Sequence, residues 1–109
     1  MNWLLQYLPE VENDMKALSK SQQIMVRKAI RKVQQNPLPQ NEGGYGKPLG
    51  NKNGLNLSGL LKIKLRSEGI RIVYKLIRTE TAILIVVIGL RADEEVYEAA
   101  RKRKDRHGL

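Results

Sequence analysis

The run TAILIVVIGL, residues 81 to 90, is the feature that most constrains how this chain can fold. Its residues are apolar on both faces of an extended strand, and the run has about half of the ~20 residues that a membrane-spanning helix needs. We therefore predict a strand from Thr81 to Ile88 that lies in the centre of a sheet and is covered on both faces.

The N-terminal part of the chain is typical of one strand and two helices. Residues 2 to 8 suit a first strand, and Pro9 suits the first turn of a short helix. A second helix is predicted to begin at an S-x-x-Q capping box formed by Ser19 and Gln22. Its end is expected at the sequence NPLP, because proline cannot continue a helix. Its apolar residues recur at helical spacing and are Val26, Ala29, Ile30 and Val33.

The C-terminal part is predicted to complete a sheet and add one helix. Strands are expected at about 59–66 and 70–77, and Asp93 suits the N-cap of a last helix that runs out into a basic tail at about 101–109. The glycine-rich stretch 40–58 is interpreted as a flexible loop, because its GGYGKP lacks the first glycine and the final Ser or Thr of a phosphate-binding loop.

The resulting fold class is α+β in one domain over residues 1–109. Two N-terminal helices are expected to pack on a four-stranded, mainly antiparallel sheet, with the C-terminal helix beside it. The chain has no cysteine, which excludes disulfides and thiolate chemistry and favours a reducing cytoplasm. The N-terminus has neither a basic leader nor a long apolar run, so we expect no signal peptide.

The sequence KIKLRSEGIRIVY, residues 62 to 74, predicts a hairpin with one apolar and one basic face. A two-residue turn at Glu68 and Gly69 places Arg66 opposite Arg71, Lys64 opposite Val73 and Lys62 opposite Lys75. Like charges that face each other destabilise a sheet, whereas arginine and lysine side chains suit phosphate oxygens. We interpret this face as an anion site. The alternative is a solvated strand face, since lysine on edge strands suppresses aggregation.

The net charge of +9 supports a polyanionic partner. A small basic domain commonly binds nucleic acid, an acidic protein segment or an anionic membrane surface. The second helix carries further basic residues, which are either a solvated face or RNA-binding side chains: Arg27, Lys28, Arg31 and Lys32. His107 is the sole histidine and is expected in a mobile tail, so a two-histidine ribonuclease mechanism is excluded. We expect no metal and no cofactor, and any catalysis must use Lys, Arg and Tyr.

The hairpin followed by GLRADEEVY, residues 89 to 97, resembles the RelE branch of the RelE/ParE superfamily of bacterial type II toxins. This resemblance implies a RelE-like, microbial-RNase-type fold and a cytoplasmic, ribosome-dependent endoribonuclease that cuts mRNA in the ribosomal A site. It implies a cognate antitoxin, the ribosome with its rRNA, and mRNA as partners. The catalytic roles of the family map onto Lys62, Lys64, Arg71, Arg91 and Tyr97.

The implied reaction is attack of a ribose 2′-hydroxyl on the adjacent phosphate, which leaves a 2′,3′-cyclic phosphate and a 5′-hydroxyl. Tyr97 or Lys64 would serve as the base, and Arg91 would face the leaving oxygen. Lys62 and Arg71 would hold the phosphate and stabilise its developing charge. Arg66 and Lys75 are expected to bind RNA beside them. Two other functions stay open: a ParE-like inhibitor of DNA gyrase, which does not need this residue set, and a non-catalytic RNA-binding module, which does not need Tyr97.

Overall fold

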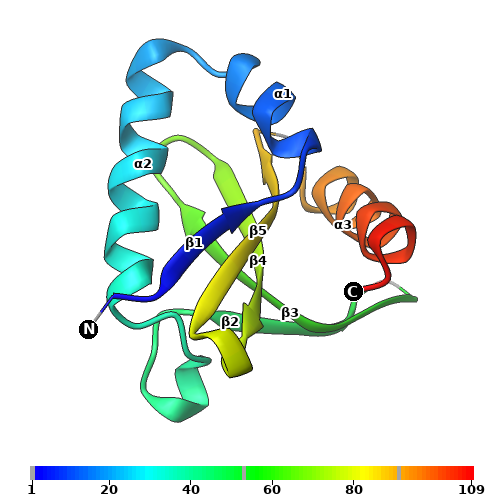
Figure 1. The fold of residues 1–109 in the computed structure, drawn as a ribbon. Helices are drawn as coiled ribbons and strands as arrows, with labels where there is room; N and C mark the ends of the chain where they lie inside the picture. The colour runs from blue at the N-terminus through cyan, green and yellow to red at the C-terminus, as the bar shows by residue number, and fades with distance from the viewer. Residues whose placement is uncertain (1, 53, 91) are drawn as a thin grey trace.

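The structure is a computed structural model that describes residues 2–52, 54–90 and 92–109 (Figure 1). Its strands are β1 (Leu4–Tyr7), β2 (Lys47–Lys52), β3 (Leu55–Leu65), β4 (Ile70–Ile77) and β5 (Ala82–Gly89). Its helices are α1 (Glu10–Lys16), α2 (Lys20–Gln35) and α3 (Asp93–His107), with short 3-10 turns η1 (Gln40–Glu42) and η2 (Arg78–Glu80). No helix in this part of the chain is long and apolar enough to cross a membrane.

The central strand of the sheet is β5, as its sequence predicts. The sheet has the order β1-β5-β4-β3-β2, in which β1 runs parallel to β5 and the other neighbours are antiparallel. Residues 82 to 88 are all buried. The reason is that helices cover the sheet from both sides: α2 lies on one side and α3 on the other (Figure 1).

Helix α2 follows the sequence pattern closely. The Ser19 hydroxyl accepts a hydrogen bond from the backbone N–H of Gln22, and the Gln22 side chain accepts one from the N–H of Ser19. The predicted capping box is therefore present, and the helix ends at Gln35 before the proline sequence. The buried residues of α2 are Val26, Ile30 and Val33, which join the hydrophobic core.

The prediction of four strands and of a flexible loop at 40–58 was wrong. Residues 47 to 52 form β2, a fifth strand that pairs antiparallel with β3 and buries Leu49. The segment before it is held by backbone hydrogen bonds, including Gly46 N–H to Leu38 O at 3.1 Å and Gln40 N–H to Gly46 O at 2.7 Å. The sequence of β2 does not predict a strand, because its glycine, proline and asparagine residues are depleted in strands.

The segment 101–109, predicted as a basic tail, is mostly the second half of α3. Arg103 donates to both carboxylate oxygens of Asp14 in α1, at 2.6 and 3.0 Å. The same pair covers the edge of β5 beyond the end of β1, because Arg103 donates to Val86 O at 2.8 Å and Ile88 N–H donates to Asp14 at 3.0 Å. His107, expected to be mobile, lies 3.0 Å from the Glu10 carboxylate. Acidic groups on α1 thus fix the basic end of the helix.

Candidate active site

The β3–β4 hairpin has a different register from the predicted one. Lys64 lies opposite Arg71, Lys62 opposite Val73 and Leu65 opposite Ile70, so the loop contains four residues. The two-residue turn and its pairs of Arg66 with Arg71 and Lys62 with Lys75 were wrong. The shift is two residues, and side chains alternate with a period of two, so the predicted facing is preserved.

The basic face of the hairpin is smaller than predicted. Val73 lies on this face and is fully buried, and α3 packs over β3, β4 and β5. The cationic side chains of this face are therefore divided: Lys62 and Arg71 contact Tyr97 and Asp93 of α3, whereas Lys75 lines a separate hollow. We call Lys62, Lys64 and Arg71 the cationic cluster.

Lys62 and Tyr97, far apart in the sequence, meet in the structure. The Lys62 ammonium donates a 2.6 Å hydrogen bond to the Tyr97 hydroxyl and lies 5.3 Å from the centre of the same ring. The Tyr97 side chain is only 3% exposed, because Val96 and Ala100 anchor this face of α3 in the core. The tyrosine hydroxyl is thus held at a fixed point of the cationic cluster.

The Asp93 carboxylate, predicted to cap α3, has a different partner in the structure. Ala92 occupies the N-cap position without a side-chain hydrogen bond, and Asp93 instead accepts from the Arg71 side chain. Partial burial raises the pKa of Asp93, but the hydrogen bond from Arg71 and the charges of the cationic cluster outweigh it and leave the pKa below its usual value. The carboxylate therefore stays ionised beside the cationic cluster.

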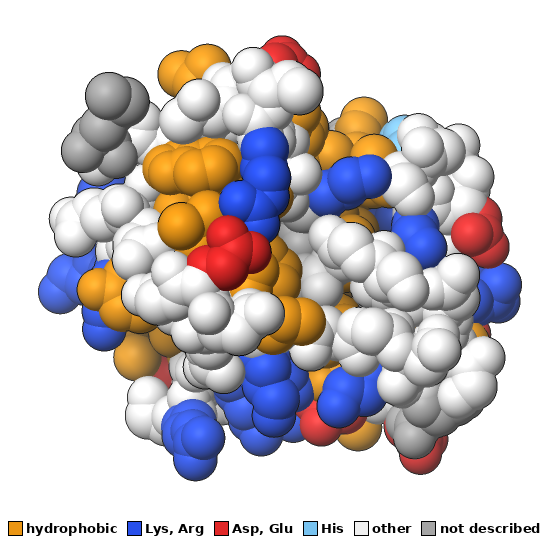
Figure 2. All heavy atoms as spheres, turned by 90° about the horizontal axis from the view of Figure 1, so that it is seen from below, with side chains coloured by type: hydrophobic (Ala, Val, Ile, Leu, Met, Phe, Trp, Pro, Cys, Tyr) orange, Lys and Arg blue, Asp and Glu red, His pale blue; other side chains and the backbone are white. Residues whose placement is uncertain are grey.

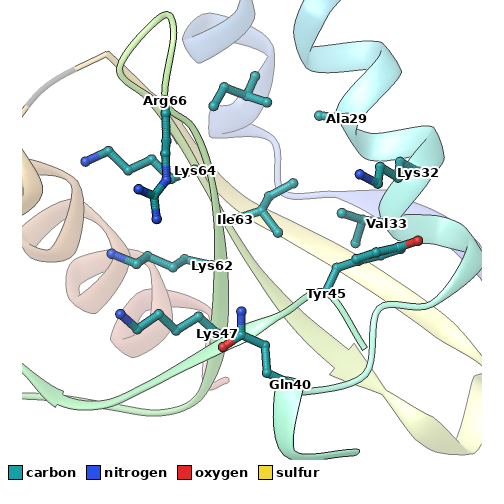
Figure 3. Close-up of a pocket in the computed structure, with 11 residues that line it drawn as sticks. Ala29, Lys32, Val33, Gln40, Tyr45, Lys47, Lys62, Ile63, Lys64 and Arg66 are labelled. Atoms are coloured by element: carbon teal, nitrogen blue, oxygen red, sulfur yellow. The ribbon is translucent and has the colours of Figure 1, made fainter. Parts of the chain in front are cut away.

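A cleft of about 470 Å³ lies beside the cationic cluster, along an edge of β3. It forms because β2 pairs with β3 only up to Lys62, opposite Lys47, so the edge of β3 beyond that point is uncovered. Figure 3 shows the side chains of Lys47, Lys62 and Lys64 extending in one direction, and that of Arg66 pointing from the end of the hairpin toward them. Tyr45 and Ile63 lie on the side of α2. Lys47 was missed in the sequence because β2 was missed: only the strand pairing brings it to Lys62.

Comparison with known proteins gives a short sequence match. No protein-family model matches the chain. Over 42 residues the chain is 45% identical to the mRNA interferase toxin RelE of Escherichia coli strain K12, and equally so to the mRNA interferase RelE of Shigella flexneri. The match spans 38% of this chain and 44% of each relative, so it covers less than half of either protein.

Solved structures extend the similarity over nearly the whole chain. A double mutant of E. coli toxin RelE in the free state has a TM-score of 0.71 at 24% identity, over 94% of this chain and 98% of RelE. The toxin–antitoxin complex RelBE2 from Mycobacterium tuberculosis gives 0.68 at 19% identity, over 85% and 95% of the two chains. The chain has the RelE toxin fold. The predicted RelE resemblance and the α+β class are confirmed, and the strand count is corrected to five within the described residues.

The RelE fold brings together most of the predicted catalytic residues. Lys62, Lys64, Arg71 and Tyr97 surround one site, whereas Arg91 lies outside the described residues. Among the predicted RNA-binding residues, Arg66 and Lys32 line the cleft.

The other predicted RNA-binding residues lie away from this cleft. Lys28 and Arg31 are exposed on α2, and Arg27 lines a separate hollow between β1, α1 and α2. Lys75 lines a further hollow, between β2, β3 and β4. The face seen from below in Figure 2 exposes hydrophobic side chains with Lys and Arg side chains around them. Basic side chains thus reach several faces, and Lys62 belongs both to the lining of the cleft and to the contact with the Tyr97 hydroxyl beside it.

Within residues 2–52, 54–90 and 92–109, no three or more Asp, Glu or His side chains are grouped so that they would hold a metal ion. The chemistry that the described site offers is that of fixed cations, one carboxylate and one phenol. The ammonium groups of lysine and the forked guanidinium of arginine suit a phosphodiester, because they neutralise its negative charge.

Proposed function

We propose that this chain is the toxin of a type II toxin–antitoxin pair and a ribosome-dependent endoribonuclease that cleaves mRNA in the ribosomal A site. The observation that carries the proposal is the contact of Lys62 with the Tyr97 hydroxyl beside the facing pair Lys64 and Arg71. Three elements converge to build this site within a RelE fold. The 42-residue match to proteins named mRNA interferases supports the same activity.

The proposed reaction is an internal transfer of the phosphodiester. The 2′-hydroxyl gives its proton to Tyr97 or Lys64, whichever acts in its deprotonated form, its oxygen forms a bond to phosphorus, and the bond from phosphorus to the 5′ oxygen breaks. The leaving oxygen takes up a proton from water, which gives a 2′,3′-cyclic phosphate and a 5′-hydroxyl. Lys62 and Arg71 stabilise the charge that develops on the phosphate, and we assign Arg91 to the leaving oxygen.

Dependence on the ribosome follows from how weak these acid and base groups are. The sole histidine, His107, contacts Glu10 rather than the cationic cluster, and arginine rarely releases a proton. Such a set needs its RNA held with the 2′-oxygen in line with the leaving oxygen. Orientation of that kind lowers a barrier by roughly 7–11 kcal/mol in the best cases. The A site of the ribosome would supply it.

An antitoxin is the second proposed partner. RelE of E. coli and its counterpart in M. tuberculosis have solved complexes with antitoxins. For this chain we propose an acidic or amphipathic antitoxin segment that covers the cationic cluster and α3, because the chain carries a net charge of +9 and three of its basic side chains gather in the cationic cluster beside α3. The expected complex is sensitive to salt, and reversing the charges of the cationic cluster should weaken it.

The deciding experiment compares mRNA on programmed ribosomes with the same mRNA free in solution. We expect cleavage within the A-site codon on ribosomes and little or none of the free RNA, with primer extension as the readout. Arg71→Ala and Arg91→Ala should each slow cleavage by about 10²–10³. Full activity in Arg91→Ala and in Tyr97→Phe would remove the mechanism, and DNA breaks through gyrase without ribosomes would favour a ParE-like function instead.

A further inference from the structure

Tyr45 is an exposed aromatic side chain at the rim of the cleft. It is 43% exposed and lines the cleft together with Lys32, Lys47 and the cationic side chains of β3. The Lys32 ammonium lies 5.1 Å from the centre of its ring. An aromatic ring left at the surface contributes little to the core, and one exposed cation–π contact is worth only about 0.5–1 kcal/mol.

The loop that carries Tyr45 is fixed by its two glycine neighbours. A Cβ on Gly44 would lie 2.0 Å from Leu38 O, and one on Gly46 would lie 2.2 Å from the Tyr74 hydroxyl. The backbone N–H of Tyr45 also donates to Asn36 O at 3.2 Å. The close packing of this loop against Leu38 and Tyr74 presents the ring at one place, which lowers the entropic cost of binding on it.

The position of Tyr45 relative to the catalytic groups indicates the path of a ligand. The side chains of Lys47 and Lys62 extend away from α2, whereas the ring of Tyr45 lies beside Lys32 and Val33 of α2 (Figure 3). The uncovered edge of β3 lies between them. A strand of RNA that leaves the cationic cluster and crosses this edge would meet the ring of Tyr45. It would pass Lys47 before the ring and Lys32 after it.

We propose that Tyr45 stacks on a nucleobase of single-stranded RNA bound along the cleft, and that Lys47 and Lys32 hold the phosphates on either side of that base. This inference rests on the proposed function, because it takes RNA to be the ligand. Base–aromatic stacking tolerates any base, so Tyr45 sets where the RNA lies rather than which codon is cut. Tyr45 is a positioning residue, remote from the reacting atoms.

The test uses short single-stranded oligoribonucleotides that carry 2-aminopurine, a fluorescent base, at one position each. Affinity is measured by fluorescence anisotropy at one fixed salt concentration. Tyr45→Ala should weaken binding roughly five- to hundredfold, and Tyr45→Phe should stay within about twofold of the wild type. Tyr7→Ala is the matched control. Tyr7 is 50% exposed but lines the separate hollow between β1, α1 and α2, so RNA binding should not change.

A second readout separates stacking from a general loss of structure. Stacking quenches 2-aminopurine, so one labelled position should be quenched by the wild type and by Tyr45→Phe, and not by Tyr45→Ala. Wild-type affinity with unchanged quenching in Tyr45→Ala would overturn the inference, as would absence of measurable RNA binding by the wild type. Cleavage on ribosomes is scored separately: if it occurs while Tyr45→Ala binds normally, only this inference fails. If stacking is observed without cleavage, the proposed function fails instead.

Discussion

The Lys62 ammonium donates a 2.6 Å hydrogen bond to the Tyr97 hydroxyl across the contact between β3 and α3. The pair joins a strand residue at the margin of the cleft to a helix residue whose ring is buried in the core. A buried ring holds the hydroxyl in place, and the hydrogen bond fixes its position relative to the cationic cluster. This contact makes Tyr97 a stronger candidate for the base than the resemblance alone would.

Replacement of Tyr97 by phenylalanine tests this role. The ring would keep its packing in the core, while the oxygen that accepts from Lys62 would be lost. We expect single-turnover cleavage on programmed ribosomes to slow by about 10²–10⁴, the usual contribution of a general base. Ribosome binding should change little, since one hydroxyl contributes little to a large charged interface. Tyr7→Phe is the control, and an equal loss in both variants would argue against a catalytic hydroxyl.

Replacement of Asp93 by asparagine tests the carboxylate inside the cationic cluster. Asp93 accepts from Arg71 and is ionised near neutral pH, so it competes with a phosphate for that guanidinium. Asparagine keeps the shape and removes one negative charge. We expect RNA to bind roughly two- to fivefold more tightly, since a partly exposed charge is screened by solvent. Anisotropy with a short RNA measures the change. Weaker binding would mean that Asp93 is needed chiefly to orient Arg71.

Replacement of Asp14 by alanine tests how α3 is fixed to α1. Asp14 and Arg103 have side chains only 10% and 15% exposed, and Asp14 also accepts from the backbone of β5. Removing one partner of a nearly buried pair leaves the other charge uncompensated, so we expect a loss of about 3 kcal/mol in urea unfolding. Glu12→Ala in the same helix breaks only an exposed pair with Lys16 and should cost less than about 1 kcal/mol. Equal effects in the two variants would contradict this assignment.

Local patterns in the sequence predicted those parts of the fold that depend on local physics. The run of apolar residues in β5 identified the central strand, and Ser19 with Gln22 identified the start of α2. The alternation in the hairpin placed Lys62, Lys64 and Arg71 on one face even though the register was wrong by two residues. Period-two patterns determine facing, whereas register depends on the turn. Here Gly69 takes a positive φ of 66° at the end of a four-residue loop.

The missed features all depend on contacts between distant segments. β2 exists because the edge of β3 pairs with it, and its own residues have little strand preference. Asp93 is a good N-cap residue by type, but Arg71 of the neighbouring strand binds its side chain. The predicted tail is helical because Asp14 and Glu10, 89 and 96 residues earlier, bind its basic side chains. Single-segment patterns carry no information about such partners.

The stability of the fold in acid is expected to depend on Glu10. The hydrogen bond from His107, with a smaller contribution from Arg106, lowers the pKa of Glu10 to about 2, although desolvation opposes the shift. A carboxylate whose pKa is lower in the folded state stabilises the fold above its ordinary pKa of 4.5, and this stability is lost as pH falls toward 2. Between these values the wild type should therefore lose more thermal stability than Glu10→Gln, which has no such group to protonate. His107→Gln should reduce the same pH dependence, because it removes the main cause of the shift. Melting curves at intervals from pH 5 to pH 2 measure the difference, and parallel Tm profiles for the three proteins would show that the contact between α1 and α3 contributes nothing in this range.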